Sequence, residues 1–258
     1  MINFVTKSII LIITMTNFPT AFLDRLGFKK GIVTYKLRKD NLKFLARAGT
    51  EDVAEIAVVA SGSEYDLSLI ELPQNPFIVD LGAHIGSFSI PLTKLLKNRC
   101  KIYAIEPDAE NYKILLNNIE LNKASSITPK NIAISDYNGK GFLDTKNIKT
   151  DAYRLTKERK KEFNCIVRTL ESSLLPAKPK KIDLLKMDIE GGEYPIVTNK
   201  KSFRYIKESV HYVFIEHHPI SRKLNGKLVK KIFSNNFIIL NESPNTFTFE
   251  NKKWRESI

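Results

Sequence analysis

Residues 77–90 read FIVDLGAHIGSFSI, an apolar run that ends in an acid and two glycines before apolar residues resume. A short run of this kind is typical of a strand that is buried on both faces of a sheet. Ligands of open α/β sheets bind just beyond the carboxyl ends of such strands. Asp80, Gly82 and Gly86 are therefore predicted to form a turn that approaches a ligand closely.

From residue 77 onward, apolar runs typical of strands alternate with apolar stripes typical of helices. Helical spacing marks residues 87–98, 108–122 and 221–236, with Asp108 as a predicted N-cap. Strands separated by helices form a parallel sheet covered on both faces. The predicted fold is α/β, a doubly wound, Rossmann-like, seven-stranded and mostly parallel sheet with an antiparallel closing strand. The expected strands are residues 77–81, 100–107, 127–135, 181–187, 210–219, 237–243 and 245–251.

Two regions of the chain fall outside this alternation. Residues 1–70 are expected to form a lead-in of helices and strands that packs on the main domain, residues 71–258. A basic insertion at about 146–168 separates the third and fourth strands, and residues 146–181 carry eleven Lys or Arg against four acids. A solvated, partly helical insertion is the simpler interpretation. The alternative is a basic flap beside the ligand crevice.

Composition limits the class of protein. The chain has 258 residues, 43% of them hydrophobic, which is enough for one sizeable core. The two cysteines provide neither a disulfide framework nor a metal-binding spacing, so a reducing, cytoplasmic setting is expected. The formal charge of +13 suits a polyanionic partner or an anionic membrane surface, although lysine-rich composition alone explains it as well.

Residues 8–23 are free of charge but short for a membrane span, and Thr, Asn and Pro19 interrupt them. A signal peptide would carry more positive charge ahead of the apolar stretch and a better cleavage site. We therefore expect a hydrophobic helix that packs on the domain or lies at a membrane surface, in preference to a cleaved signal or an anchor.

Two acids at consecutive strand ends indicate the cofactor class. Glu106 ends the second strand, 20 residues after Gly86, where a carboxylate accepts hydrogen bonds from ribose hydroxyls. A dinucleotide site would need G-x-G-x-x-G, whereas the run here is GAHIGS, and His84 would obstruct a pyrophosphate. Asp80 would repel a pyrophosphate but suits the sulfonium and ammonium of S-adenosylmethionine. The residues favour this methyl donor.

At this point the sequence resembles a known family. FIVDLGAHIGSFSI, IYAIEPDAENYKILLNNIELN, NIAISDYNGKGFL, RTLESSL and IDLLKMDIEGGEYPIV occur in the order found in the FkbM family of class I S-adenosylmethionine-dependent methyltransferases. The resemblance covers about residues 45–219. It implies that Asp80, Gly82 and Gly86 form the donor loop, that Glu106 holds the ribose and that Ala133 edges the adenine. His84 stands in this loop where the family usually has Asn.

Candidates for the acceptor side lie at the ends of the fourth and fifth strands, in KMDIEGGE and IEHHP. Methyl transfer from a sulfonium needs the acceptor to be positioned and its proton removed. We expect Asp188 to orient acceptor and donor, His217 to take the proton and His218 to pack elsewhere. Asp188 and Glu190 are the alternatives for the proton. Asp188, Glu190, Glu216 and His217 could also gather a divalent ion, but their spacing does not require one, and no metal site is predicted.

The class of acceptor is narrowed mainly by exclusion. An amino-methylating DNA enzyme needs an Asp/Asn-Pro-Pro-aromatic run and a cytosine-C5 enzyme needs Pro-Cys, and the sequence has neither. The family resemblance implies O-methylation, and we expect a hydroxyl of a sugar, glycan or small secondary metabolite as acceptor. RNA 2′-hydroxyl methylation and an inactive binding module are the alternatives. Nucleic acid is not the expected partner. Residues 8–23 could make peripheral contact with a membrane, and no oligomeric state is predicted.

Overall fold

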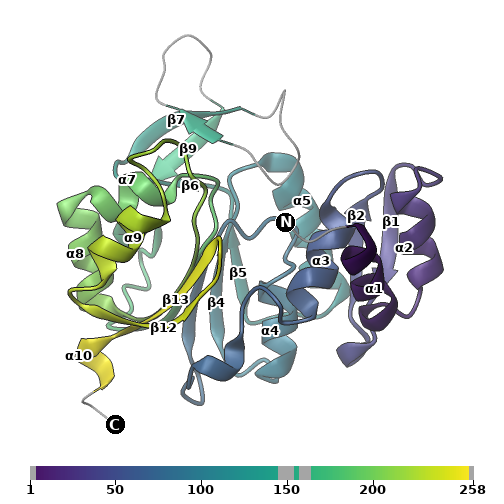
Figure 1. Cartoon of the computed structure of the whole chain (residues 1–258), viewed down its shortest axis with the longest axis horizontal. Coiled ribbons are helices and arrows are strands. Elements are labelled where there is room, and N and C mark those ends of the chain that lie inside the picture. The colour runs from purple at the N-terminus through teal and green to yellow at the C-terminus, as the bar shows by residue number, and fades with distance from the viewer. Residues whose placement is uncertain (1–3, 145–153, 157–163, 256–258) are drawn as a thin grey trace.

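A computed structural model describes residues 4–144, 154–156 and 164–255 of the chain. Its centre is a seven-stranded sheet in the order β12-β13-β11-β10-β3-β4-β5 (Figure 1). β3, β4, β5, β10 and β11 are parallel, and β13 runs antiparallel between β11 and β12. The predicted fold class is confirmed. The strands are β3 (Phe77–Leu81), β4 (Lys101–Ile105), β5 (Ile127–Lys130), β10 (Ile182–Met187), β11 (Val210–Glu216), β12 (Phe237–Glu242) and β13 (Thr246–Asn251).

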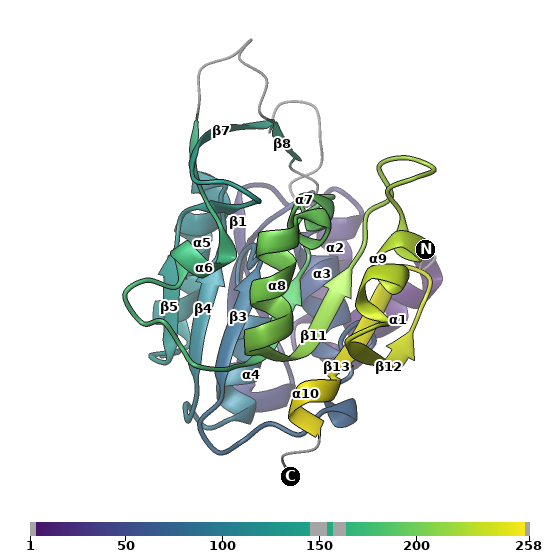
Figure 2. The ribbon, with the colours of Figure 1, turned by 90° about the vertical axis from the view of Figure 1, so that its left-hand side faces the viewer.

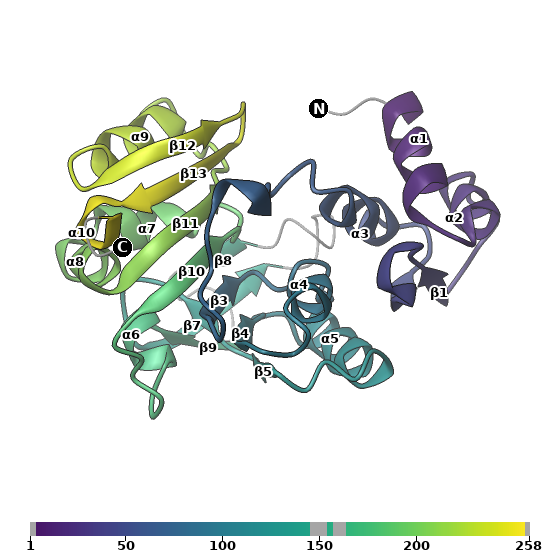
Figure 3. The same cartoon turned by 90° about the horizontal axis from the view of Figure 1, so that it is seen from below.

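Successive residues of the parallel strands enter two separate apolar clusters, as the two-residue period of a strand requires. On β10, Leu184 belongs to the first cluster and Leu185 to the second. The first cluster includes residues of α3, α4 and α5, and the second includes residues of α7, α8 and α9, so helices cover both faces of the sheet (Figures 2 and 3). These helices are α3 (Asp52–Ala60), α4 (Ser89–Leu95), α5 (Ala109–Leu121), α7 (Glu193–Thr198), α8 (Lys200–Ser209) and α9 (Gly226–Phe233).

Residues 4–60 form what we call the N-terminal unit, which packs beside α5 at the end of the molecule opposite α8 and α9 (Figures 1 and 3). Leu11 and Met15 are buried in the first apolar cluster, and Asn118 of α5 hydrogen-bonds the backbone of Leu45. None of the helices in the described part of the chain has both the length and the hydrophobicity needed to cross a bilayer. The unit contains α1 (Phe4–Thr14), α2 (Phe18–Arg25), β1 (Ile32–Lys36), β2 (Lys43–Arg47) and α3.

The segment after β5 departs from the prediction of one strand over residues 127–135. β5 ends at Lys130, and β6 (Ala133–Ile134) joins a different sheet with β9 (Cys165–Arg168), β7 (Gly139–Asp144) and β8 (Arg154–Thr156). Asn131 separates the two strands, and its side chain donates to the backbone oxygens of Glu106 and Pro107. Most of the predicted basic insertion, including the stretch 157–163, lies outside the described residues. The short helices α6 (Leu170–Ser173) and α10 (Lys252–Arg255) complete the chain.

Candidate active site

A cavity of about 290 Å³ lies at the carboxyl ends of β3, β4, β10 and β11. This is the edge at which open α/β sheets bind their ligands. Gly82, His84, Glu106 and Ala133 line one part of the cavity, and Asp188, Glu190, Glu216 and His218 line another. The strand ends therefore bring six of the nine predicted site residues into one cavity, and Asp80, Gly86 and His217 are not among its lining.

The two predicted loop glycines differ in what they make room for. Both have positive φ, +77° at Gly82 and +94° at Gly86. A Cβ on Gly82 would lie 1.8 Å from the carbonyl oxygen of Asp188, so the loop after β3 and the loop after β10 touch there. A Cβ on Gly86 would meet Ile90 and Leu115 instead. Gly86 thus serves helix packing, whereas Gly82 joins the two ligand-binding loops.

Asp80 does not reach the cavity as predicted. It is fully buried, accepts a hydrogen bond of 2.6 Å from Ser89 Oγ and lies 3.3 Å from Lys186 Nζ. The Lys186 ammonium also lies 3.3 Å from Asp188 Oδ2 and donates to the Gly82 oxygen at 2.9 Å. Burial raises the pKa of the Asp80 carboxyl, and the charge of Lys186 opposes that rise. Asp80 therefore holds Lys186 in place and does not line the cavity itself. Lys186 in turn links the donor loop to Asp188.

Glu106 is held rigidly at the end of β4. Its Oε2 accepts from the His84 backbone N–H at 2.8 Å, and its Oε1 accepts from the Asp108 N–H at 2.9 Å and from Asn111 Nδ2 at 3.3 Å. Burial raises its pKa, an effect opposed by His84 and by these donors. The carboxylate has lone pairs left for further donors, as the hydroxyls of a ribose would supply.

His84 has a left-handed backbone, with φ of +48°, which His and Asn tolerate better than most residues. Its Nδ1 lies 2.6 Å from Glu55 Oε2 and its Nε2 lies 3.4 Å from Asp52 Oδ1. Burial disfavours the imidazolium, yet Glu55, Asp52 and Glu106 outweigh it and raise the pKa of His84 to about 9. Since Asp52 and Glu55 belong to α3, His84 ties the donor loop to the N-terminal unit.

An apolar wall closes the part of the cavity beyond Glu106. It is formed by Ile132, Ala133 and Ile134 from the segment after β5, and by Leu143 and Leu155 from β7 and β8. A flat adenine would find such surroundings next to the ribose carboxylate, so the donor end fits a nucleoside. Although most of the insertion is not described, its strand β8 does reach the cavity.

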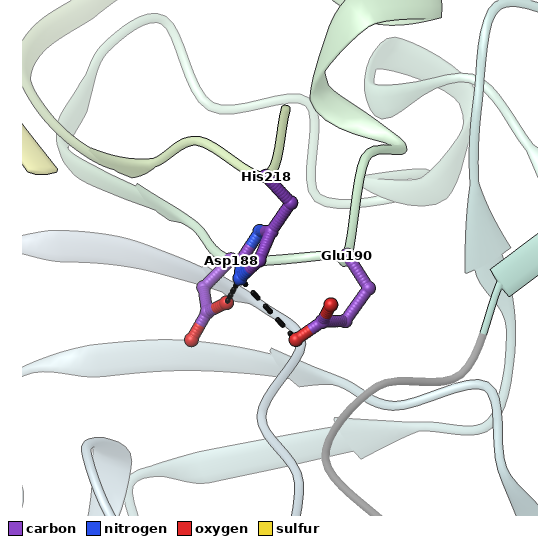
Figure 4. Close-up of side chains that lie close together, drawn as sticks. All are labelled: Asp188, Glu190 and His218. Carbon is purple, nitrogen blue, oxygen red and sulfur yellow. Dashed lines mark ion pairs between the residues drawn. The ribbon is translucent and has the colours of Figure 1, made fainter. Parts of the chain in front are cut away.

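The acceptor end of the cavity is a cluster of acids around one histidine (Figure 4). His218 Nε2 lies 3.3 Å from Glu190 Oε1, 3.9 Å from Asp188 Oδ1 and 3.7 Å from Glu216 Oε1, while its Nδ1 lies 3.5 Å from Glu193 Oε1. Burial opposes the imidazolium, but Glu193, Asp188 and Glu190 raise the pKa of His218 to about 10. At neutral pH this histidine is therefore a cation.

The predicted positions of the two adjacent histidine side chains are reversed. His217 stacks on Phe247, with ring centroids 5.4 Å apart, and its ring packs against Gly226. Burial lowers its pKa, assisted by the charge of His218. Glu216, the last residue of β11, and His218 both line the cavity, and the side chain of His217 between them faces away from it. The assignment of the proton acceptor to His217 is therefore wrong in its geometry.

Three further residues of the acceptor end were missed or left unassigned. Tyr65 donates to Asp188 Oδ2 at 3.3 Å, and Glu64 hydrogen-bonds Glu216. Burial, followed by the charge of Asp188, raises the pKa of Glu216 to about 9 and raises the pKa of Glu64 as well. The pair thus retains a proton at neutral pH. Glu64 and Tyr65 belong to the SEYDL stretch, which precedes the sheet and was treated only as lead-in.

A divalent ion is the other cation that this cluster could hold. Within the described part of the chain, ligand atoms of Asp188, Glu190 and His218 all lie within 4.8 Å of one another. Histidine and carboxylate suit several divalent metals, but the histidine must first lose its proton. With its pKa raised to about 10, His218 is already a cation at neutral pH and balances the carboxylates without a metal. The expected absence of a metal stays a prediction.

A second cavity of about 230 Å³ adjoins the first. Leu37 and Leu42 of the N-terminal unit line it, and Val59, Tyr65 and Phe88 line both cavities. The N-terminal unit therefore contributes to the surroundings of the acceptor end as well as to the donor loop.

The chain is similar in sequence to known methyltransferases. The methyltransferase FkbM domain matches residues 80–239. Methyltransferase sdnD of Sordaria araneosa is 45% identical over 62 residues, which are 24% of this chain and 23% of that protein. The tRNA (guanine(37)-N(1))-methyltransferase of Heterostelium pallidum is 31% identical over 112 residues, 42% of this chain and 25% of that protein. The chain spans about a quarter of the length of the curated relatives it matches.

Two solved structures are similar at low identity. Methyltransferase FkbM from Methylobacillus flagellatus KT has a TM-score of 0.49 and 20% identity, over 77% of this chain and 54% of that one. TYW2 of M. jannaschii in complex with AdoMet has a TM-score of 0.40 and 15% identity, over 86% and 88%. The family match covers more than half of the chain and includes Asp80, Glu106 and Asp188. The chain therefore belongs to the FkbM family of class I methyltransferases, whose methyl donor is S-adenosylmethionine.

Proposed function

We propose that the chain is an O-methyltransferase that transfers a methyl group from S-adenosylmethionine to a hydroxyl of a sugar, glycan or small secondary metabolite. The observation that carries this proposal is the convergence of Asp188, Glu190, Glu216 and His218 on the cavity that Glu106 and Ala133 also line. Bound there, the donor supplies an activated methyl group, so the chain need only hold the acceptor in line and receive its proton.

Asp188 is the residue we assign to the acceptor hydroxyl. Lys186 and Tyr65 both contact its Oδ2, at 3.3 Å each, and His218 Nε2 lies 3.9 Å from its Oδ1. These contacts fix the carboxylate and leave Oδ1 as the less engaged oxygen for an incoming O–H. His218, held as a cation by its acidic neighbours, positions Asp188 and Glu190 and is not free to take a proton at neutral pH.

The charge of the acceptor end favours an acceptor without anionic groups near the reacting hydroxyl. Four acids line this end, Glu64, Asp188, Glu190 and Glu216. Because Glu64 and Glu216 share a proton, the four carry three negative charges against the two cations Lys186 and His218. A phosphate placed among these carboxylates would be repelled. This argues against the alternative of RNA 2′-hydroxyl methylation, in which phosphates flank the acceptor. An inactive binding module would have no use for a fixed carboxylate such as Asp188.

The donor half of the proposal is tested with Glu106→Gln. Both Glu106 oxygens accept backbone N–H groups, so a Gln amide would place a donor against a donor and also weaken the contact with ribose hydroxyls. Affinity for S-adenosylhomocysteine, measured by calorimetry, should fall by about 1.5–3 kcal/mol. Glu110→Gln, on the first turn of α5, is the matched control and should bind normally. Equal affinities for the two variants would remove the ribose assignment.

The transfer half is tested by following labelled methyl from S-adenosylmethionine into a panel of sugars, glycans and phenolic metabolites, with total RNA as a separate arm. Asp188→Asn should lower kcat about a hundredfold, the usual scale for a positioned acid–base group. His218→Gln removes the cation that positions Asp188 and should also lower kcat. Both should still bind S-adenosylhomocysteine, and His217→Gln should remain close to wild type. Label found only in RNA, or normal turnover by Asp188→Asn, would refute the proposal.

A further inference from the structure

Exposed apolar side chains gather on the N-terminal unit. Of the fifteen large apolar side chains that are exposed in the described part of the chain, nine lie between residues 9 and 32. Phe28 is 74% exposed and Ile13 is 59% exposed. Soluble proteins normally scatter such residues singly, and a concentration of them marks an interaction surface.

The exposed residues follow helical stripes, so they are not an accident of loop structure. Ile9, Ile12 and Ile13 share one face of α1, while Leu11 and Met15 point into the core. Phe18, Phe22 and Leu26 repeat every four residues along α2 and its C-cap. α1 and α2 pack on one another at one end of the molecule (Figure 3). Each helix thus buries one face and presents a second apolar face outward.

The chain around these helices is rich in basic residues. Residues 9–40 contain six Lys or Arg and two acids, Asp24 and the exposed Asp40. Asp24 is buried, accepts a hydrogen bond of 2.7 Å from Tyr35 OH and another of 2.6 Å from the Gly49 N–H, and offers no exposed charge. Lys30 and Lys36 are exposed. The N-terminal unit therefore combines apolar stripes with basic side chains, the pattern of segments that lie in the interface of anionic membranes.

We propose that the chain docks on an anionic phospholipid surface through the exposed faces of α1 and α2. The described part of α1 has 11 residues, which suits a contact in the interface of the bilayer. A second copy of the chain fits this surface less well, because two such faces would bring lysines against lysines. The same N-terminal unit contacts the donor loop through His84 and lines the second cavity. Docking through α1 and α2 therefore connects the membrane surface to the surroundings of the site.

The experiment is co-sedimentation of the full chain with phosphatidylcholine vesicles, with and without phosphatidylglycerol. Binding should need phosphatidylglycerol and should weaken as salt is added. Ile13→Glu, and separately Lys30→Glu with Lys36→Glu, should each lower the partition coefficient about tenfold. The matched controls lie elsewhere on the molecule: Leu116→Glu on α5, 41% exposed, and Lys227→Glu with Lys231→Glu on α9. Each control should stay within about twofold of wild type.

No acceptor or turnover enters this experiment, so its outcome is independent of the proposed O-methylation. Retained affinity for S-adenosylhomocysteine shows that each variant is folded. If Ile13→Glu does not fold, two results still test the proposal. They are the lipid and salt dependence of wild-type binding and the binding of the variant with Lys30→Glu and Lys36→Glu. A wild type that ignores anionic vesicles overturns the proposal. Equal losses of binding in the control variants would also overturn it. A dimer in solution that Ile13→Glu dissociates would overturn it too, because the face would then be assigned to a second copy of the chain.

Discussion

His217 and His218 are neighbours in the sequence, but their surroundings shift their pKa values in opposite directions. His218 meets four carboxylates and is cationic, whereas His217 is packed against Phe247 and its pKa is lowered. In the sequence both follow a strand end and both are plausible bases. Which of them faces the cavity depends on where the strand stops relative to the sheet, and one residue of register decides it.

The altered pKa of His218 should appear in the stability of the protein. Its folded-state pKa of about 10 lies above the ordinary 6.5, so the folded protein keeps a proton that the unfolded chain releases between these values. The stabilising contribution is complete below pH 6.5 and is lost as the pH rises towards 10. We expect the free energy of unfolding to fall by about 1–3 kcal/mol over this window.

Urea titrations at a series of pH values measure this fall. His84 and Glu216 also have raised pKa values and contribute in the same direction, so the variant His218→Gln should reduce the slope and not abolish it. His217→Gln is the control, because a histidine whose pKa is lowered does not titrate in this window. A slope that His218→Gln leaves unchanged would contradict the assignment of His218 as a buried cation.

At the scale of elements, the apolar runs and helical stripes predicted the fold because burial on both faces leaves a clear pattern. β3, β4, β10 and β11 lie where they were expected, and Asp108 caps α5 as predicted. The segment 127–135 misled because apolar residues lie on both sides of Asn131, whose side chain bonds to the loop after β4. Such a contact depends on tertiary position, which no local pattern contains.

The candidate site could be predicted from the sequence only in part, because some of its contacts also depend on tertiary position. Strand ends place Glu106, Asp188 and Glu190 in the cavity, and position alone suffices to find them. Position alone also selected Asp80, whose partners Ser89 and Lys186 turn it inward. Glu64 and Tyr65 come from a loop more than 100 residues away from Asp188 along the chain, and only the fold brings them together.

The loops after β3 and β10 touch at Gly82. This contact leads to a prediction that separates the stability cost of backbone strain from the cost of a steric clash. Gly82 and Gly62 have nearly equal φ, +77° and +73°, but a Cβ on Gly82 would collide with the Asp188 carbonyl while Gly62 faces open space. Gly62→Ala should cost about 1 kcal/mol of unfolding free energy, the cost of positive φ alone. Gly82→Ala should cost at least about 3 kcal/mol and abolish donor binding. Equal urea midpoints for the two variants would show that the loops do not touch.

At the scale of the whole molecule, the N-terminal unit is joined to the sheet by a shared apolar cluster. Leu11 and Met15 of this unit belong to the same cluster as Ile78 of β3 and Phe214 of β11. Asp52 pairs with Arg47 and with His84, which connects the unit to the donor loop by charge as well. α1 and α2 thus each have one exposed face, which we propose meets lipid, and another face that is buried against the core of the protein.

This arrangement predicts that damage to α1 is felt at the far end of the molecule. Leu11 is buried and Ile12, its neighbour, is 48% exposed, so Leu11→Ala should lower the unfolding free energy by about 2–4 kcal/mol and Ile12→Ala by less than about 0.5 kcal/mol. Trp254, the single tryptophan, lies in α10 on the side of the molecule away from α1 (Figure 1) and reports unfolding there. If the chain unfolds as one cooperative unit, Trp254 fluorescence and far-ultraviolet circular dichroism should give the same lowered urea midpoint for Leu11→Ala. A Trp254 transition that stays at the wild-type midpoint while the circular dichroism changes earlier would mean that residues 4–60 unfold separately.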